Sequence, residues 1–406
     1  GGGNKDGWLK LCSFKALALG ELLCRAAMHP SAAALALAAA IFARGLAEPA
    51  CVLAPNGKML CCAANDYECI EKAKKAHAEP ASHPPSTDTR PQSKSWMFGS
   101  MYTFANATVW ETTSERPFDV VIVGTPFGYD TAHEAPGLQL IRRETSRMGG
   151  YSRLYGTSIQ DLVVVDGQDL VISGNSMERF RGFEVAALPF FKSGKPVVAL
   201  GGDQSITVPL LRAAKEAAGD FAVIHIDKDL AIGSGSREQA LTASTAMFWG
   251  AATSLFDTRH SLHVGARGNL DSQRVELIDQ ELGFQTILAE DIAVQGVSAT
   301  VSRIKDRLAR RDGTFMPAYL SLDLDVLDPA YFPGREPGGL SVKELRALLA
   351  GLRPFCVLVG AELRDVAPLS EAASLKVAAA LAHDLVLLAG RTTDKAVVPP
   401  NLKHEL

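Results

Sequence analysis

The chain has 406 residues, of which 47% are hydrophobic and 21% are charged, and its formal net charge is −4. This is the composition of an ordinary globular protein, and the length suits one large α/β domain or two smaller ones. The small acidic excess, with no long basic run and no zinc-finger spacing, argues against a nucleic-acid partner.

An apolar segment near the N-terminus, Ser31–Ala43, is too short to span a bilayer. Met28 precedes it and the small residues of Gly45–Ala47 follow it. We therefore expect a signal peptide at residues 28–47, within a leader of residues 1–47, and no membrane span in the mature chain. A buried or amphipathic helix is the alternative interpretation of the same segment.

The next segment, residues 48–95, differs from the rest of the chain in its cysteines and prolines. Four cysteines crowd together as in a small disulfide-stapled unit, although adjacent cysteines are not expected to pair with each other. They are Cys51, Cys61, Cys62 and Cys69. Residues 76–95 are polar and Pro-rich, which predicts a linker between this segment and the main domain.

The main domain is expected at residues 96–396, followed by a tail of residues 397–406. The tail ends in Lys403-His404-Glu405-Leu406, which is similar to a KDEL-type retrieval signal. With the expected signal peptide and cysteines, it predicts a protein of the secretory pathway, in the lumen of the endoplasmic reticulum. Entry into a plastid or another organelle through a bipartite leader is the alternative.

From Phe118 onward, short apolar runs rich in β-branched residues alternate with amphipathic stretches. The runs predict eight strands: Val120–Gly124, Leu162–Asp166, Val197–Gly201, Ala222–Asp227, Ser261–Ala266, Thr286–Glu290, Ala318–Asp325 and Cys356–Glu362. The stretches predict helices, among them Val208–Ala218, Ser272–Gly283, Val301–Arg311, Val342–Leu352 and Ser370–Gly390. This alternation predicts a parallel sheet covered on both faces, and it leaves undecided whether the sheet closes into a barrel.

Acidic residues occur at the ends of four predicted strands, where either architecture places its active face. Two of these strands end in an Asp-x-Asp pattern, Asp227 with Asp229 and Asp323 with Asp325. Because side chains alternate along a strand, each pair is expected to share one face. If the two strands are neighbours, four carboxylates converge.

Such a cluster needs a compensating charge. Two carboxylates about 4 Å apart repel by roughly 4 kcal/mol at an effective dielectric constant of 20. Four of them must therefore bind a cation or take up protons. Oxygen ligands suit a hard divalent ion, so we expect a site for Mn²⁺, Mg²⁺ or Ca²⁺, or the remnant of one. Helix N-caps, surface charges and ion pairs with Lys228 or Arg364 are the alternative explanations.

Several segments resemble the ureohydrolase family, which includes arginase and agmatinase. The resemblance rests on Gly201–Ser205 (GGDQS), His225–Ala231 (HIDKDLA) and Ser321–Ser341 (SLDLDVLDPAYFPGREPGGLS), and is closest to agmatinase. It implies a three-layer α/β/α sandwich around an open, parallel, eight-stranded sheet. It also implies a two-manganese centre, at which hydroxide attacks a guanidinium carbon and releases urea. The implied partner is a guanidino or amine small molecule.

The chain departs from the family pattern at three of the six metal-ligand positions. Gln204 stands in place of a His and is at best a weak ligand through its amide oxygen. Asp229 replaces a second His, and Ala231 replaces an Asp. The positions that match the family are Asp227, Asp323 and Asp325. One ion would therefore lose most of its ligands, while the other would keep an all-carboxylate cage.

Two positions implied in catalysis differ as well. Ser244 stands where the family has a His that would act as a proton shuttle, and Asp365 replaces the Glu that would pair with the guanidinium. A single ion among carboxylates acidifies water less than a pair does. We therefore expect one divalent cation, no binuclear manganese centre, and a pseudoenzyme that serves as a scaffold or ligand binder, as a homo-oligomer or within a larger assembly. The alternative is an active amidinohydrolase with an altered metal site.

Overall fold

The computed structural model divides the chain into two units, Gly1–Pro91 and Gln92–Leu406. It describes residues 102–110, 117–126, 135–172, 176–332, 336–366 and 372–390, together with the backbone of two short strands in the first unit. The expected signal peptide, the Pro-rich linker and the Lys403–Leu406 tail lie outside the described residues. Those expectations remain predictions.

In the first unit, the two short strands pair in antiparallel fashion. They are β1 (Ala50–Leu53) and β2 (Met59–Cys62), and their register places Cys51 opposite Cys61. Cys69 lies outside the described residues. The expected disulfide staple is therefore untested.

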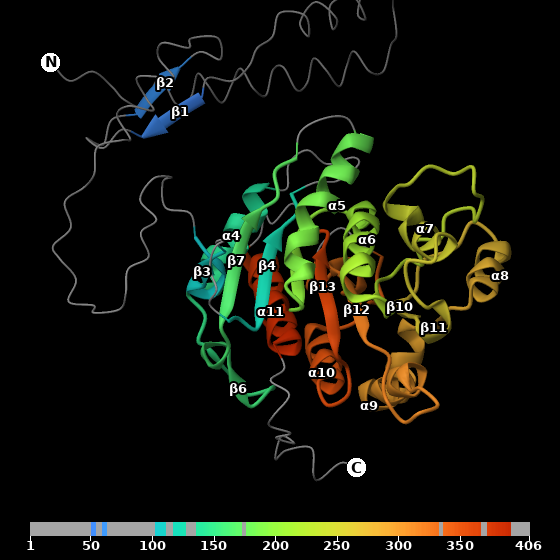
Figure 1. Cartoon of the computed structure of the whole chain (residues 1–406). Coiled ribbons are helices and arrows are strands. Elements are labelled where there is room, and N and C mark those ends of the chain that lie inside the picture. The colour runs from blue at the N-terminus through green and yellow to red at the C-terminus, as the bar shows by residue number, and fades with distance from the viewer. Residues whose placement is uncertain are drawn as a thin grey trace, which may run out of the picture. The chain divides into compact units, whose positions relative to one another are not determined.

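Among the described residues, the second unit is built on a parallel sheet of nine strands in the order β11-β10-β9-β12-β13-β8-β4-β7-β3. In chain order these are β3 (Thr108–Val109), β4 (Val120–Gly124), β7 (Val164–Asp169), β8 (Val197–Leu200), β9 (Ala222–Ile226), β10 (Leu262–Ala266), β11 (Gln285–Leu288), β12 (Ala318–Asp323) and β13 (Leu358–Arg364). The sheet has two edges and is open, as Figure 1 shows. Eight of its strands overlap the predicted ones, while β3, with two residues, is too short to produce a periodic signal.

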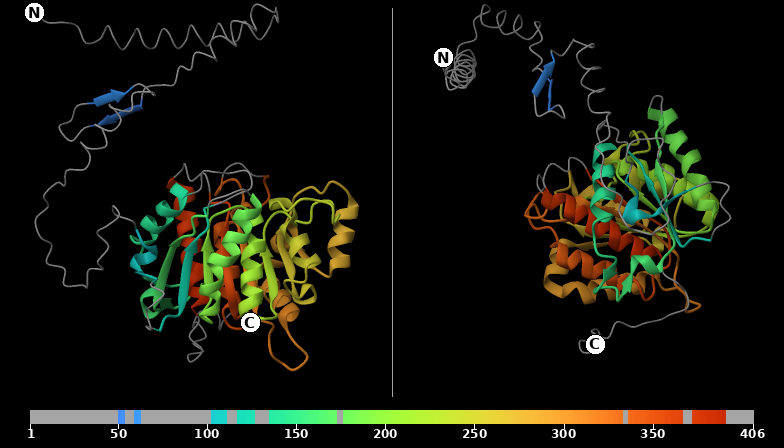
Figure 2. Two further views of the ribbon diagram at one scale, coloured as in Figure 1. Left: turned by 45° about the horizontal axis from the view of Figure 1, so that its top comes forward. Right: turned by 90° about the vertical axis from the view of Figure 1, so that its left-hand side faces the viewer.

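Helices cover both faces of this sheet, and the two layers enclose separate apolar cores (Figures 1 and 2). One core includes residues of α4 (Ala135–Thr145), α9 (Ala289–Leu308), α10 (Val342–Leu352) and α11 (Ala372–Ala389). The other includes residues of α5 (Ser176–Lys192), α6 (Thr207–Ala218), α7 (Ala246–Ala252) and α8 (Gln273–Leu282). The predicted three-layer α/β/α sandwich is therefore confirmed.

The minor elements are short turns and a small hairpin. They are β5 (Tyr151–Ser152) with β6 (Thr157–Ser158), and the 3₁₀ helices η1 (Phe104–Asn106), η2 (Ile159–Asp161), η3 (Gln204–Ile206), η4 (Ala243–Thr245), η5 (Thr258–His260) and η6 (Leu324–Val326). No helix among the described residues combines the length and apolarity needed to cross a bilayer.

Local sequence explains where several helices begin and end. Ser341 accepts a hydrogen bond from the Glu344 backbone N–H, and Glu344 accepts one from Ser341 N, which forms a capping box at the start of α10. Gly283 ends α8 with φ of 100°, a left-handed conformation that glycine adopts at low cost. These local signals fix the helix ends against the sheet.

Four strands, β8, β9, β11 and β12, end earlier than predicted, and for β9 and β12 the difference matters for the site. The predicted strand Ala318–Asp325 stops at Asp323, because Asp323 caps η6 by accepting a hydrogen bond from Asp325 N at 2.8 Å. Likewise β9 stops at Ile226, and Asp229 N donates to Asp227 Oδ1 at 3.1 Å. Both Asp-x-Asp patterns therefore turn the chain at the point where a strand ends. Alternation along a strand does not decide where their side chains point.

Candidate metal centre

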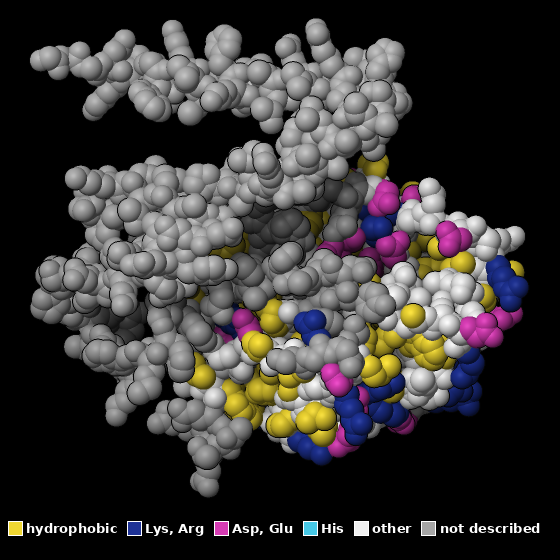
Figure 3. Space-filling model, turned by 90° about the horizontal axis from the view of Figure 1, so that it is seen from above, with side chains coloured by type: hydrophobic (Ala, Val, Ile, Leu, Met, Phe, Trp, Pro, Cys, Tyr) yellow, Lys and Arg dark blue, Asp and Glu magenta, His cyan; other side chains and the backbone are white. Residues whose placement is uncertain are grey.

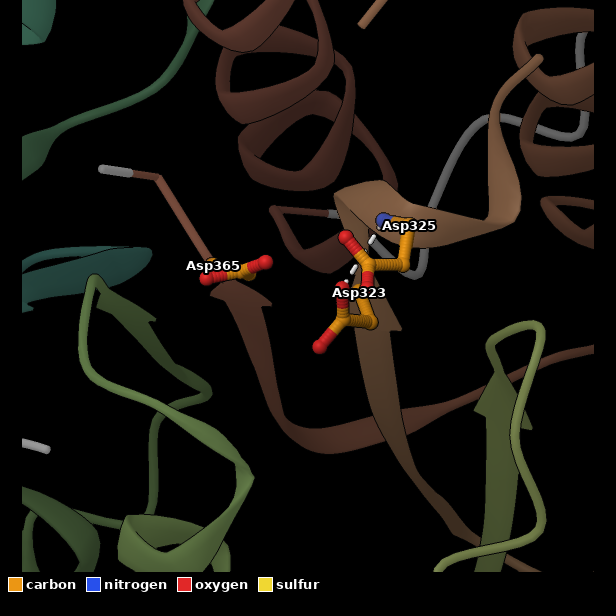
Figure 4. A group of neighbouring side chains, drawn as sticks. All are labelled: Asp323, Asp325 and Asp365. Atoms are coloured by element: carbon orange, nitrogen blue, oxygen red, sulfur yellow. Dashed lines mark hydrogen bonds between the residues drawn. The ribbon is translucent and has the colours of Figure 1, made fainter. Parts of the chain in front are cut away.

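The carboxyl ends of four central strands, in the order β9-β12-β13-β8, meet at one edge of the sheet. Three carboxylates come together there: Asp323 at the end of β12, Asp325 in the turn that follows it, and Asp365 directly after β13 (Figure 4). Each offers an oxygen, and these oxygens all lie within 4.8 Å of one another. Asp323 and Asp325 are buried and Asp365 is half-buried. This grouping suits a single hard cation.

Asp227 lies beside this group, although it is not one of the three. It is 5% exposed, and its pKa is raised well above its ordinary value by burial, then by the charges of Asp229 and Asp325. Its Oδ2 lies 3.2 Å from Nε2 of His225, a neutral side chain because burial lowers its pKa to about 4. The four-residue convergence predicted from sequence is therefore realised in part, with Asp227 next to the group.

Asp229 behaves differently from the other three carboxylates. Its side chain is about half exposed and forms an ion pair with Lys228, whose Nζ lies 2.7 Å from Asp229 Oδ2 and 3.3 Å from Glu336 Oε2. This is the Lys228 ion pair considered as an alternative at the sequence level. Asp229 is thus exposed and charge-compensated, and Asp365 takes the third place in the carboxylate group. In the space-filling view from above, acidic side chains gather around a basic side chain on part of the visible face (Figure 3).

Gln204 occupies η3, where two glycines with positive φ, Gly201 and Gly202, turn the chain after β8. Its Nε2 donates to Ser321 Oγ at 2.9 Å. Ser321 Oγ in turn donates to Glu362 Oε1 at 2.7 Å, within a fully buried network. Gln204 Oε1 is buried without a hydrogen-bond partner among the described residues. An unsatisfied buried oxygen is costly, which keeps Gln204 a weak candidate ligand.

The two remaining predicted positions offer little to a second ion. Ala231 is buried, and its carbonyl accepts hydrogen bonds from Met247 N at 3.0 Å and Phe248 N at 3.2 Å, at the start of α7. Ser244 lies exposed in η4, with its Oγ 3.1 Å from Thr242 Oγ1. A serine hydroxyl does not titrate near neutral pH, so it replaces none of the acid–base capacity of an imidazole.

The comparisons with known proteins identify the family of the chain. The model of the arginase family matches residues 118–388. The chain belongs to the arginase family. The predicted recognition of a ureohydrolase is confirmed, and the match spans the strands from β4 to β13, both helical layers and the carboxylate group.

Relatives within the family include amidinohydrolases. Proclavaminate amidinohydrolase of Streptomyces clavuligerus is 29% identical over 267 residues, which cover 63% of this chain and 82% of that protein. Its solved structure aligns with a TM-score of 0.63 at 25% identity, over 72% of this chain and 97% of that one. The agmatinase of Escherichia coli O7:K1 is 28% identical over 280 residues, covering 66% of this chain and 86% of that one.

Sequence reasoning missed two features of the site. Asp365 was expected to pair with a guanidinium, whereas in the structure its carboxylate joins Asp323 and Asp325. His225 was not singled out, although it precedes Asp227 by two residues and lies against it. The available signal was the spacing His225-Ile226-Asp227, which places an imidazole two residues before a predicted ligand.

Proposed function

We propose that this arginase-family protein binds one hard divalent cation at Asp323, Asp325 and Asp365 and does not hydrolyse guanidino compounds at an appreciable rate. Its role would then be that of a ligand binder or scaffold. Mn²⁺, Mg²⁺ and Ca²⁺ all suit a carboxylate site of this kind. When bound, such an ion supplies charge compensation for the buried carboxylates and a Lewis acid for any ligand that enters.

The observation that carries this proposal is the environment of Ala231. Its side chain is a methyl group, and its backbone oxygen is already engaged by Met247 and Phe248 at the start of α7. Ala231 therefore provides no oxygen or nitrogen ligand, although the family resemblance implies that this position binds one ion. With the Gln204 amide nitrogen bonded to Ser321, the second ion would keep too few ligands to compete with water.

The place of Asp365 supports the same conclusion. A carboxylate that neutralises a cation together with Asp323 and Asp325 is not available to orient a substrate guanidinium. Ser244 adds no proton shuttle. The place of Asp365 would thus weaken binding of a substrate, and the lack of an imidazole at Ser244 would weaken activation of a nucleophile.

A second candidate function is amidinohydrolysis with an altered metal site. Two observations favour it: proteins named agmatinase and proclavaminate amidinohydrolase are among the relatives, and the carboxylate group retains the geometry for one ion. The products would be urea and an amine.

Urea release separates the two candidates. The full chain, loaded with Mn²⁺, is incubated with agmatine, arginine or guanidinobutyrate, and metal per chain is measured on the same sample. We expect about one ion per chain and urea formation at least roughly 10³-fold below that of an active family member, as when transition-state charge stabilisation is lost. Turnover within tenfold of that enzyme would overturn the proposal in favour of the hydrolase.

A further inference from the structure

A basic hollow lies at the edge of the sheet where β10 and β12 begin. It has a volume of about 570 Å³ and is formed by η5, which precedes β10, and by the end of α9 with the turn that follows it. The charged and titratable side chains that line it are Arg259, His260, Asp306, Arg307, Arg310 and Arg311. The carboxylates of the metal centre lie at the opposite ends of β12 and β13, and the length of β12 separates the two places by roughly 17 Å.

Arg307 is held in this hollow by neutral acceptors. Its Nε donates to Ser261 O at 3.1 Å, and its Nη2 donates to Thr258 O at 3.1 Å and to Gly283 O. These carbonyl groups fix the guanidinium without cancelling its charge. Partial burial lowers the pKa of Arg307, although the charge of Asp257 opposes this shift. A positive charge is thus held in a place where an anion would stabilise it.

Arg310 and Arg311 keep hydrogen-bond donors for a ligand. Nε and Nη2 of Arg310 lie 3.2 Å and 2.7 Å from the thioether sulfur of Met316, which is a weak acceptor. Neither arginine forms an ion pair with another described residue. The carboxylate of Asp312 feels the charge of Arg310, but it accepts hydrogen bonds from Thr314 N at 2.9 Å and Thr314 Oγ1 at 2.6 Å.

Helix capping and internal ion pairs do not account for this cluster. Basic side chains near a helix C-terminus often bind the last carbonyl groups of that helix. Here Arg307 donates to carbonyls outside α9, and Arg310 contacts a sulfur. Arg259 has an 84% exposed side chain, and its Nε lies 3.7 Å from Asp257 Oδ1, which is long for an ion pair. Asp306, the one carboxylate in the lining, is exposed.

We propose that the hollow binds a small molecule that carries two or more linked phosphoryl groups. A guanidinium donates two parallel hydrogen bonds to a phosphate, and the arginines of η5 and of the turn after α9 offer several such places. A single phosphate would leave part of the positive charge uncompensated. The volume falls within the range of small-molecule sites. The inference goes beyond the proposed function, because it gives the chain a second ligand site that needs no metal ion.

Calorimetric titration of the full chain with pyrophosphate tests this, in a chelator that prevents binding through a cation. We expect a dissociation constant below about 1 mM in 0.15 M salt. The variant Arg310→Gln/Arg311→Gln should bind pyrophosphate about 10–100-fold more weakly, because charge-assisted hydrogen bonds are lost. The control variant Arg237→Gln/Arg274→Gln removes the same charge from exposed positions outside the hollow and should bind like wild type.

The possible outcomes each decide the matter. Wild-type protein that binds no pyrophosphate at about 10 mM overturns the inference, and so does an equal loss in the control variant, which would show attraction by general charge. Citrate or sulfate bound as tightly as pyrophosphate would overturn the choice of linked phosphoryl groups. If the double variant does not fold, Arg259→Gln decides, since its exposed side chain can be replaced safely and should weaken binding about 3–10-fold. An unchanged affinity there would contradict the inference.

Discussion

At the scale of single residues, each position that departs from the family pattern makes a contact of its own. Asp229 pairs with Lys228 at the surface, Gln204 bonds Ser321 through its nitrogen, and Ala231 contributes its carbonyl to the start of α7. Asp227 keeps its buried place. The residues at these positions therefore take part in local hydrogen bonds and ion pairs.

The buried carboxyl of Asp227 predicts that the metal-free protein becomes less stable as pH rises. Its raised pKa means that the folded state holds this proton above pH 3.8, where the unfolded chain releases it, so stability falls as pH rises through that range. We expect Asp227→Asn, measured by thermal unfolding in chelator, to be more stable than wild type at pH 7–8. This difference in stability should shrink toward pH 4. Each kcal/mol of it corresponds to a change in unfolding temperature of about 2–4 °C.

Asp271→Asn is the control for this measurement, since Asp271 is exposed and lies outside the carboxylate group. An Asp227→Asn variant no more stable at pH 8 than at pH 4, relative to wild type, would contradict the prediction.

At the scale of elements, the turn after β12 depends on a residue from another strand. Arg267, directly after β10, donates from Nη1 to Val326 O at 3.1 Å and from Nη2 to Asp325 O at 2.8 Å and Leu327 O at 3.1 Å. It also reaches Glu336 O at 3.0 Å, so one guanidinium ties together both ends of the loop. The orientation of Asp325 is therefore set by β10 as well as by its own strand.

We expect Arg267→Lys to lower the free energy of unfolding by about 1–3 kcal/mol, because a lysine ammonium does not reproduce several fixed donors toward four carbonyls. Cation affinity should fall in the same variant, since Asp325 loses its fixed position. Chemical denaturation and calorimetric titration with Mn²⁺ measure the two effects. Arg274→Lys, on the exposed side of α8, should change neither by more than about 0.5 kcal/mol, and an equal loss there would show that Arg267 has no special place.

At the scale of the whole molecule, the arginase-family sandwich is intact, although we propose that it holds one ion and not two. Both cores are closed, and the four central strands still deliver their carboxyl ends to one edge. The backbone of Ala231 has φ of 52°, a left-handed conformation that Asp tolerates better than Ala. The scaffold therefore suits an Asp at this position, which is the residue that the family resemblance implies.

We therefore expect that a second ion can be introduced. We expect the combined substitutions Gln204→His, Asp229→His, Ala231→Asp and Ser244→His to raise bound Mn²⁺ from about one ion per chain to about two, because the returning ligands supply the imidazoles and carboxylate that the resemblance implies. Elemental analysis of the purified, folded variant gives the ratio. A ratio that stays at one would mean that the backbone around the site has also diverged.

Much of the architecture could be predicted from sequence because its signals are local. Apolar β-branched runs alternating with amphipathic stretches predict a parallel sheet with covered faces, and acidic residues after the strands mark the edge where chemistry is placed. The strand limits were harder to predict, since Asp323 ends its strand by capping η6, an interaction between side chain and backbone that periodicity does not register.

The sequence by itself determined the fold class, the family and the edge of the sheet that carries the carboxylates. The tertiary structure alone decided that Asp229 turns to Lys228, that Asp365 joins Asp323 and Asp325, and that His225 meets His263. The physical reason is how far apart in the chain the interacting residues lie. Strands and helices follow from neighbouring residues, whereas the direction of a carboxylate after a turn and the pairing of two buried imidazoles depend on contacts between residues far apart in the chain.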